Sequence, residues 1–138
     1  MIVLTVSPLW EGDNPEVVDA FLNAMKNQTL AKSMFFILAI NECKDKEQSA
    51  FFKQMLSWSN LHRSFFYNVH PEYFEGPYNV PVWSKNPEKI EVTWRKEAQE
   101  LIKMWTGVNY LWIVSGDNLV SPKGLEMLVN DDKDVVGF

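Results

Sequence analysis

The chain of 138 residues is 46% hydrophobic and 14% aromatic, which is enough for one sizeable core and too little for two ordinary domains. A net charge of −5, with 13 Lys and Arg residues scattered along the sequence, excludes extended nucleic acid as an expected partner. With one cysteine, no secretory start and no run of about 20 apolar residues, the sequence predicts a cytoplasmic protein without an intrachain disulfide or a membrane span.

The chain opens with features typical of a strand followed by a helix. Residues 2–6 form a β-branched run that predicts a buried strand, stopped by Pro8. Asn14 then supplies an N-cap and Pro15 a first-turn proline, and apolar residues recur at helical spacing behind them. We therefore expect a helix over residues 15–28.

A central strand and a second helix are expected next. Residues 34–40 are continuously apolar, as in a parallel strand that is covered on both faces. Asp45 opens the second helix. Its inward-facing positions are Phe51, Phe52, Met55 and Leu56. Residues 64–69 suit a third strand, and the proline-rich and aromatic residues 70–86 are typical of a long binding loop or lid.

The second half of the chain continues the alternation. Residues 87–106 begin with a helix-start signal, carry one apolar stripe and end before Gly107, which predicts a further helix. Residues 110–114 form a fourth predicted strand, and a short helix begins at Pro122. Residues 135–138 then predict a terminal strand.

These elements predict both the fold class and the position of a site. Alternating strands and helices indicate right-handed crossovers and a mostly parallel, three-layer α/β/α sheet, which forms a single Rossmann-like domain over residues 1–138. In such sheets ligands bind at the carboxyl ends of the strands. Polar or turn residues follow three predicted strands, at Ser7 to Glu11, Asn41 to Asp45 and Ser115 to Asn118. We expect these segments on one edge of the sheet.

The last of the three segments carries oxygen ligands around a glycine. Asp117, Asn118 and Ser115 offer hard oxygen atoms. Gly116 lets the backbone approach, as Mg²⁺ or Mn²⁺ bound to a diphosphate requires. The same residue types also favour tight turns for backbone reasons alone, so a simple turn is the alternative interpretation.

A series of motifs has the order and approximate spacing of a known family. The motifs are Pro8 with Trp10, Gln28-Thr29, Asn41 to Asp45, Arg95, Tyr110 to Asp117, Pro122, and Asp134 to Gly137. This order resembles the first half of the GT-A glycosyltransferases, especially the large inverting family that includes cellulose, chitin and hyaluronan synthases. None of the motifs is specific alone, but together they extend over nearly the whole chain.

The resemblance implies a nucleotide-diphosphate sugar as donor, with a UDP-sugar favoured, and Mn²⁺ or Mg²⁺ as cofactor. It places Asp117 and Asn118 at the metal. The residues that it places around the nucleotide are Pro8, Trp10, Asn41, Asp45, Arg95 and Ser115. Two positions depart from the family pattern. Ser115 stands where the family has the first acid of an Asp-x-Asp pair, and Asn41 stands where it has an acid at the end of the second strand.

The family's general base, an acid that deprotonates the acceptor hydroxyl, would lie beyond residue 138, as would most of the acceptor site. We therefore expect a domain that binds the donor and that needs a further segment or a partner, such as a second copy of itself, to transfer the sugar. Two alternatives stay open. One is a non-catalytic binding or assembly module that pairs through its terminal edge strand. The other is an unrelated α/β enzyme with Cys43 as its nucleophile.

Overall fold

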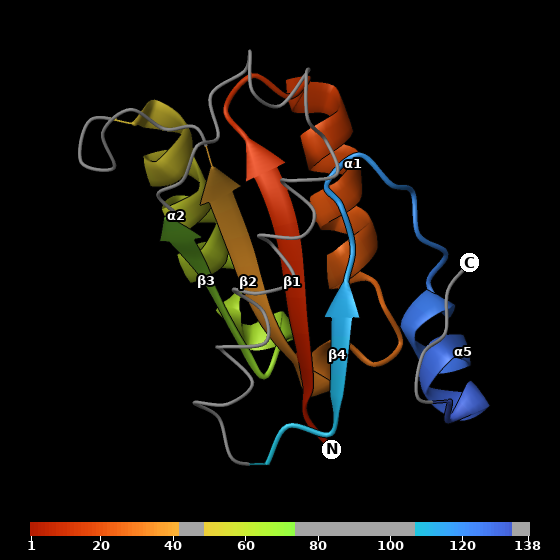
Figure 1. The fold of residues 1–138 in the computed structure, drawn as a ribbon. Coiled ribbons are helices and arrows are strands. Elements are labelled where there is room, and N and C mark those ends of the chain that lie inside the picture. The colour runs from red at the N-terminus through yellow and green to blue at the C-terminus, as the bar shows by residue number, and fades with distance from the viewer. Residues whose placement is uncertain (42–48, 74–106, 134–138) are drawn as a thin grey trace.

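The computed structural model describes residues 1–41, 49–73 and 107–133. Its centre is a sheet of four strands, all parallel, in the order β3-β2-β1-β4 (Figure 1). The strands are β1 (Val3–Trp10), β2 (Met34–Asn41), β3 (Asn68–Tyr73) and β4 (Tyr110–Ile113). With helices packed beside it, this sheet confirms the predicted α/β class and is consistent with a Rossmann-like domain.

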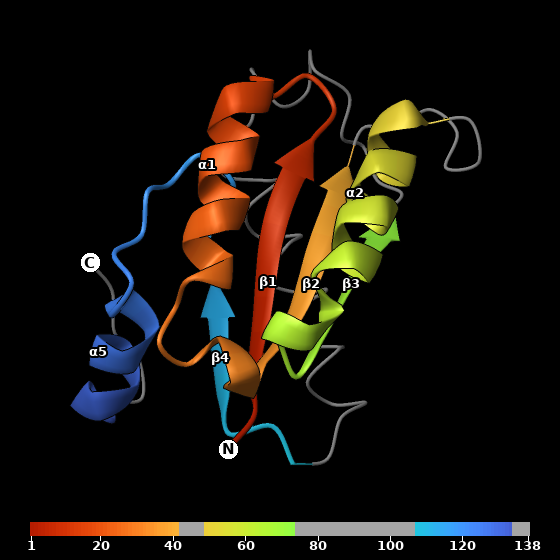
Figure 2. The same ribbon diagram turned by 180° about the vertical axis from the view of Figure 1, so that it is seen from behind.

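Two helices cover one face of the sheet, as the view from behind shows (Figure 2). They are α1 (Pro15–Lys26), which joins β1 to β2, and α2 (Ala50–Leu61), which lies between β2 and β3 in the chain. A third helix, α5 (Gly124–Asp131), lies on the β4 side, and short 3₁₀ helices precede β2 and β3 as η1 (Ala31–Ser33) and η2 (Arg63–Phe65). The predicted helix over residues 87–106 and the predicted strand over residues 135–138 lie outside the described residues, so the third layer stays a prediction.

The starts of the two covering helices follow from local capping. Asn14 accepts a hydrogen bond from the backbone N–H of Glu16 at 2.9 Å, which confirms the predicted N-cap of α1. Ser49 Oγ accepts in the same way from the N–H of Phe52 at 3.0 Å, so α2 begins at Ala50. Asp45, the predicted start of this helix, lies outside the described residues.

Alternate residues of the strands fill the two faces of the sheet. The side toward α1 and α2 carries Val3, Leu9, Met34, Phe36, Leu38, Ile40 and Val69, which pack on buried helix residues such as Phe21 and Met25. The opposite face carries Leu4, Val6, Phe35, Ile37 and Ala39, all of them buried. Burial on both faces is typical of parallel sheets and agrees with the continuous apolar run of β2. Leu56, predicted to face inward from α2, is instead 41% exposed.

The first strand is longer than predicted, because Pro8 does not stop it. β1 continues to Trp10, and its pairing with β2 includes Pro8 opposite Ala39. The carbonyl oxygen of Pro8 accepts a hydrogen bond from the N–H of Gly116, so the nitrogen of Pro8 faces the β4 side as well. The ladder with β4 has already ended there at Ile113, so little pairing is lost.

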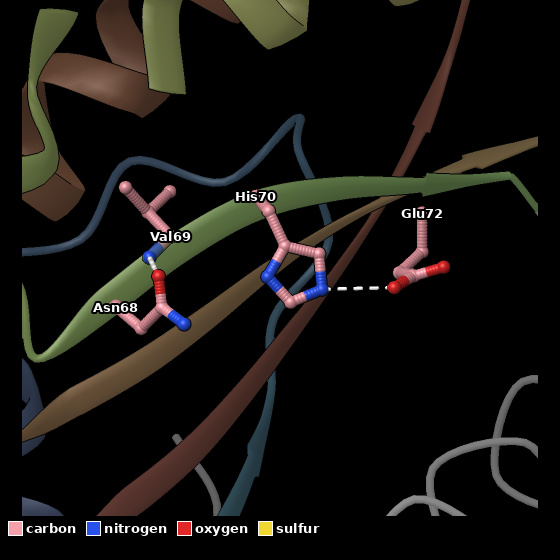
Figure 3. Close-up of polar contacts among 4 residues, drawn as sticks. All are labelled: Asn68, Val69, His70 and Glu72. Carbon is pink, nitrogen blue, oxygen red and sulfur yellow. Dashed lines mark hydrogen bonds and ion pairs between the residues drawn. The ribbon is translucent and has the colours of Figure 1, made fainter. Parts of the chain in front are cut away.

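The third strand was predicted over residues 64–69 and lies further along the chain. Residues from the predicted strand form η2 instead, and β3 runs on through Pro71. The N–H of Val69 donates to Oδ1 of its neighbour Asn68 at 2.8 Å (Figure 3). The N–H of Val69 is therefore on the side of β3 that faces away from β2. The nitrogen of Pro71, two residues later in the strand, points to the same side. A proline is tolerated at such a position of an edge strand.

No helix in the described ranges has both the length and the apolar composition needed to cross a membrane.

Candidate functional site

The order of the strands defines a switch point between β1 and β4. From β1 the chain passes through α1 to β2 on one side, whereas β4 pairs with the other side of β1. Ligands of open α/β sheets bind in the crevice outside the carboxyl ends of strands at such a point. The segments predicted to hold a ligand, after β1 and after β4, meet here (Figure 1).

Backbone hydrogen bonds hold these two segments together beyond the end of β4. The N–H of Val114 donates to the carbonyl of Val6 at 3.1 Å, and the N–H of Gly116 donates to the carbonyl of Pro8 at 3.2 Å. A side chain at position 116 would overlap Cδ2 of Leu9, a residue that is only 1% exposed. Glycine is therefore favoured here by the close approach to β1. The approach of Gly116 to a metal-bound diphosphate, for which the sequence predicted it, stays a prediction.

Residues 115–118 form a tight turn. The backbone N–H and the side-chain Nδ2 of Asn118 both donate to the carbonyl of Ser115, at 3.2 and 3.3 Å. The turn interpretation is thus confirmed for the backbone, and it does not exclude a ligand. Both Asp117 and Asn118 are exposed at the edge of the sheet, so the Asp117 carboxylate and the Asn118 Oδ1 are oxygen atoms that the turn presents at this edge.

A second carboxylate, which the sequence analysis missed, lies at the same edge. Asp13 closes the turn that follows β1: its N–H donates to the carbonyl of Trp10, and its Oδ2 accepts from the N–H of Trp10, both at 3.0 Å. Burial raises the pKa of Asp13 above its ordinary value of 3.8, the Trp10 N–H opposes this shift, and the negative charge of Asp117 raises the pKa further. Both acids thus lie at the carboxyl ends of neighbouring strands, β1 and β4. The signal that could have identified Asp13 in the sequence is its place as an acid between the end of the first strand and the helix cap Asn14.

The indole of Trp10 lies against its own turn. A Cβ added to Gly12 would overlap the Trp10 ring, so this glycine leaves room for the indole, which is half-buried. Trp10 is paired in register with Asn41, the last residue of β2, and Pro8 with Ala39. The backbones of Pro8, Trp10 and Asn41 thus lie at the same end of two neighbouring strands, as predicted.

An open cavity of about 260 Å³ lies next to the turn after β4. The first half of α1 contributes Glu16, Val17 and Ala20, and the segment after β4 contributes Asp117, Asn118 and Leu119. Val17 and Leu119 are exposed apolar residues, and no Lys or Arg is among the described residues that line the cavity. Its chemistry suits a neutral or cationic ligand with an apolar face and hydroxyl or amino groups for the carboxylates.

Another polar cluster lies on β3 and does not join this site (Figure 3). His70 Nε2 and Glu72 Oε1 are 2.8 Å apart, and the imidazole stands edge-on to the ring of Phe35 at a centroid distance of 5.4 Å. β2 and β1 separate this pair from β4. The Glu72 contact and the ring contact give His70 a structural role in the sheet.

The structure therefore brings together five of the predicted site residues at one edge. They are Pro8, Trp10, Ser115, Asp117 and Asn118. Asn41 reaches the same edge through its backbone, and Asp45 and Arg95 lie outside the described residues. Within the described ranges, no group of three or more His, Cys, Asp or Glu residues is arranged to hold a metal ion. No protein-family model matches the sequence, and no curated protein shows significant similarity to it.

Proposed function

We propose that the edge between β1 and β4 binds a nucleotide-diphosphate sugar, with a UDP-sugar favoured, through Mn²⁺ or Mg²⁺. The domain would transfer the sugar to an acceptor hydroxyl together with a further segment or partner that supplies the general base. The observation that carries this proposal is the place of Asp117, which the hydrogen bonds from the segment after β4 to β1 hold at the switch point of the sheet, at the edge where Asp13 closes the turn after β1. Two carboxylates at this place suit a cation, and a cation suits a diphosphate.

The residues present fit a metal that is shared with its substrate. Mg²⁺ in phosphate-binding sites is commonly held by one or two carboxylates and by the substrate's own phosphates, so a third acidic ligand is not required. Asp117 and Asp13 would hold the ion, and Asn118 can add its Oδ1, since its Nδ2 is already used in the turn. When bound, the metal supplies positive charge that neutralises the departing diphosphate.

In this proposal, the remaining residues at the edge contact different parts of the ligand. The half-buried indole of Trp10 offers an apolar surface for the base, beside Pro8 and the end of β2 at Asn41. The cavity beside α1 takes the sugar, because the Glu16 and Asp117 carboxylates can accept hydrogen bonds from hydroxyl groups. The described lining of this cavity is acidic and apolar, so the phosphates are assigned to the metal instead.

Calorimetric titration of UDP and GDP into this chain, with and without Mn²⁺, tests the proposal. We expect metal-dependent binding that weakens about tenfold or more in Asp117→Ala and in Asp13→Ala, because loss of a charged ligand costs a few kcal/mol at such a site. Asp19→Ala is the matched control, since Asp19 is an exposed acid of α1 that does not line the cavity. Absence of binding to either nucleotide would reject the proposal and favour the assembly-module alternative.

The raised pKa of Asp13 predicts a pH dependence with a defined sign. The metal binds the deprotonated carboxylate, so affinity for Mn²⁺ and nucleotide should fall as the pH drops through the raised pKa, earlier than for an ordinary aspartate. Without metal the effect on folding is opposite: protonation favours the folded state, so stability falls as the pH rises from 3.8 through the folded-state pKa.

The variant Asp13→Asn should remove both pH dependences. It should stabilise the metal-free protein at pH 7 and weaken the binding of metal and nucleotide. Titrations and urea unfolding between pH 4 and pH 8 measure the two effects; an unchanged binding profile in Asp13→Asn would show that Asp13 is not a ligand.

A further inference from the structure

The end of the molecule opposite the site carries exposed apolar and cationic side chains. α1 ends there at Lys26, followed by η1, and α2 ends beside them and leads into η2 (Figure 2). Leu61, the last residue of α2, is 77% exposed, and Phe65 of η2 is 43% exposed. Lys32 of η1 and Arg63 of η2 are exposed as well. We call Lys26, Lys32, Leu61, Arg63 and Phe65 the amino-end patch.

Direct contacts join the members of the amino-end patch. Lys26 Nζ lies over the Phe65 ring, 5.1 Å from its centroid, and Lys32 Nζ donates to the carbonyl of Ser64. Arg63 Nη2 donates to Oδ1 of Asn60 at 3.1 Å. Within the described part of the chain, none of the three cations forms an ion pair with an acid. The patch therefore holds positive charge that its described surroundings do not neutralise.

The acids at the amino end of the sheet lie on the β4 side and not in the patch. Glu126 of α5 accepts from Thr29, and Asp132 accepts from Tyr110, the first residue of β4. The amino-end patch itself, on the α1 and α2 side, contains three cations and no acid, whereas the carboxyl end carries Asp13, Glu16 and Asp117. The chain as a whole has a net charge of −5, so general attraction to an anionic surface is not expected. Any such attraction has to come from the patch, with the acidic end turned away.

We propose that the amino-end patch binds the surface of an anionic phospholipid bilayer. Leu61 and Phe65 enter the boundary between headgroups and acyl chains, and Lys26, Lys32 and Arg63 contact the phosphates around them. Lysine is depleted in the cores of protein interfaces, whereas lysines beside leucine and phenylalanine are the composition of surfaces that lie on membranes. This composition favours a lipid surface over an acidic protein as the occupant.

This orientation would hold the site in water. The eight residues of β1, at about 3.3 Å each, separate the two ends of the sheet by roughly 25 Å. The Asp13 and Asp117 edge would then face away from the bilayer, accessible to a soluble ligand. The proposal does not depend on what that ligand is.

Co-sedimentation with vesicles tests the proposal. The chain should bind vesicles that contain about 30% phosphatidylserine in phosphatidylcholine, should not bind pure phosphatidylcholine, and should be released by high salt. Lys26→Gln/Lys32→Gln/Arg63→Gln should reduce binding about tenfold or more, because each cation near an anionic surface contributes a severalfold factor. Leu61→Ala/Phe65→Ala should reduce binding similarly through loss of the inserted apolar groups.

Matched controls come from other surfaces of the chain. Lys53→Gln/Lys123→Gln/Lys133→Gln removes the same charge from exposed positions outside the patch, and Leu56→Ala/Met127→Ala removes exposed apolar groups elsewhere. Both should bind vesicles like the unchanged chain, and circular dichroism should show all variants folded. The proposal is overturned if the chain does not bind anionic vesicles, if the control variants lose as much binding as the patch variants, or if Leu61→Ala/Phe65→Ala binds unchanged. Nucleotide titration is independent of these outcomes.

Discussion

Gly116→Ala should destabilise the protein by about 1–3 kcal/mol and weaken metal-dependent nucleotide binding about tenfold or more. The new Cβ would overlap Cδ2 of Leu9 and lie 3.2 Å from the carbonyl oxygen of Pro8. Leu9 is buried in the core beneath α1 and cannot move without disturbing its neighbours, and the Pro8 carbonyl is backbone. The turn that carries Asp117 must then move away from β1, which separates the two acids.

Urea unfolding and nucleotide titration measure the two effects of Gly116→Ala. Gly12→Ala is an informative control, because its Cβ would also overlap a side chain, that of Trp10, but this indole is half-buried and can swing aside. We expect a smaller loss of stability there. The double variant Leu9→Ala/Gly116→Ala should lose less stability than the two single effects together, because Leu9→Ala makes room for the new methyl group. Additive losses, or a Gly116→Ala variant with unchanged binding, would contradict the packing argument.

Much of the sheet could be predicted because its signals are local. The continuous apolar run of residues 34–40 identifies a strand buried on both faces, and β2 covers almost the same range. The cap and proline at Asn14 and Pro15 likewise fix the start of α1. The strand ends were less predictable. Pro8 was read as a strand stop and Pro71 as part of a long loop. Each instead lies within a strand, with its nitrogen on a side where little or no ladder pairing is lost, and this depends on the neighbouring strands.

The position of the candidate site could be predicted from the sequence, but not all of its residues could. Parallel strands alone bring the ends of β1, β2 and β4 to one edge, which places Trp10 and Asp117 there from sequence. Asp13 was missed because its significance comes from burial and from the nearby charge of Asp117, a residue far along the chain. The packing of Gly116 on Leu9 is likewise a contact between distant segments, which no local pattern reports.

The Gln28-Thr29 pair shows the same limit, since the sequence supplied a motif without a role. Gln28 is only 4% exposed, at the end of α1. Its Nε2 donates to the carbonyls of Ala24 at 3.0 Å and Ser121 at 2.8 Å, and its Oε1 accepts from the N–H of Leu125 at 3.1 Å. One buried amide thus ties α1 to the segment that leads from the Asp117 turn into α5.

Gln28→Ala should therefore destabilise the protein by about 2–4 kcal/mol, among the larger effects that a polar residue of this chain can produce. The substitution leaves the buried Leu125 N–H, in the first turn of α5, without its partner, and an unsatisfied buried group costs about 1–3 kcal/mol. It also removes one of the two hydrogen bonds to the Ser121 carbonyl, which keeps the bond from the Gly124 N–H, and the bond to the Ala24 carbonyl. Because Ser121 follows the Asp117 turn closely in the chain, we also expect weaker metal-dependent nucleotide binding. Urea unfolding monitored by tryptophan fluorescence, with titration of the folded variant, measures both effects.

Thr29→Ala is the matched control for this prediction, one residue further along. Thr29 Oγ1 makes an exposed 3.3 Å hydrogen bond to Glu126, whereas its backbone N–H donates to the Pro122 carbonyl at 2.8 Å and is unaffected by the substitution. We expect a loss of about 0.5 kcal/mol or less, because exposed hydrogen bonds exchange readily with water. If Gln28→Ala were as mild as Thr29→Ala, the buried amide would not be what anchors the segment, and the packing of Leu125 against the core would have to hold α5 in place alone.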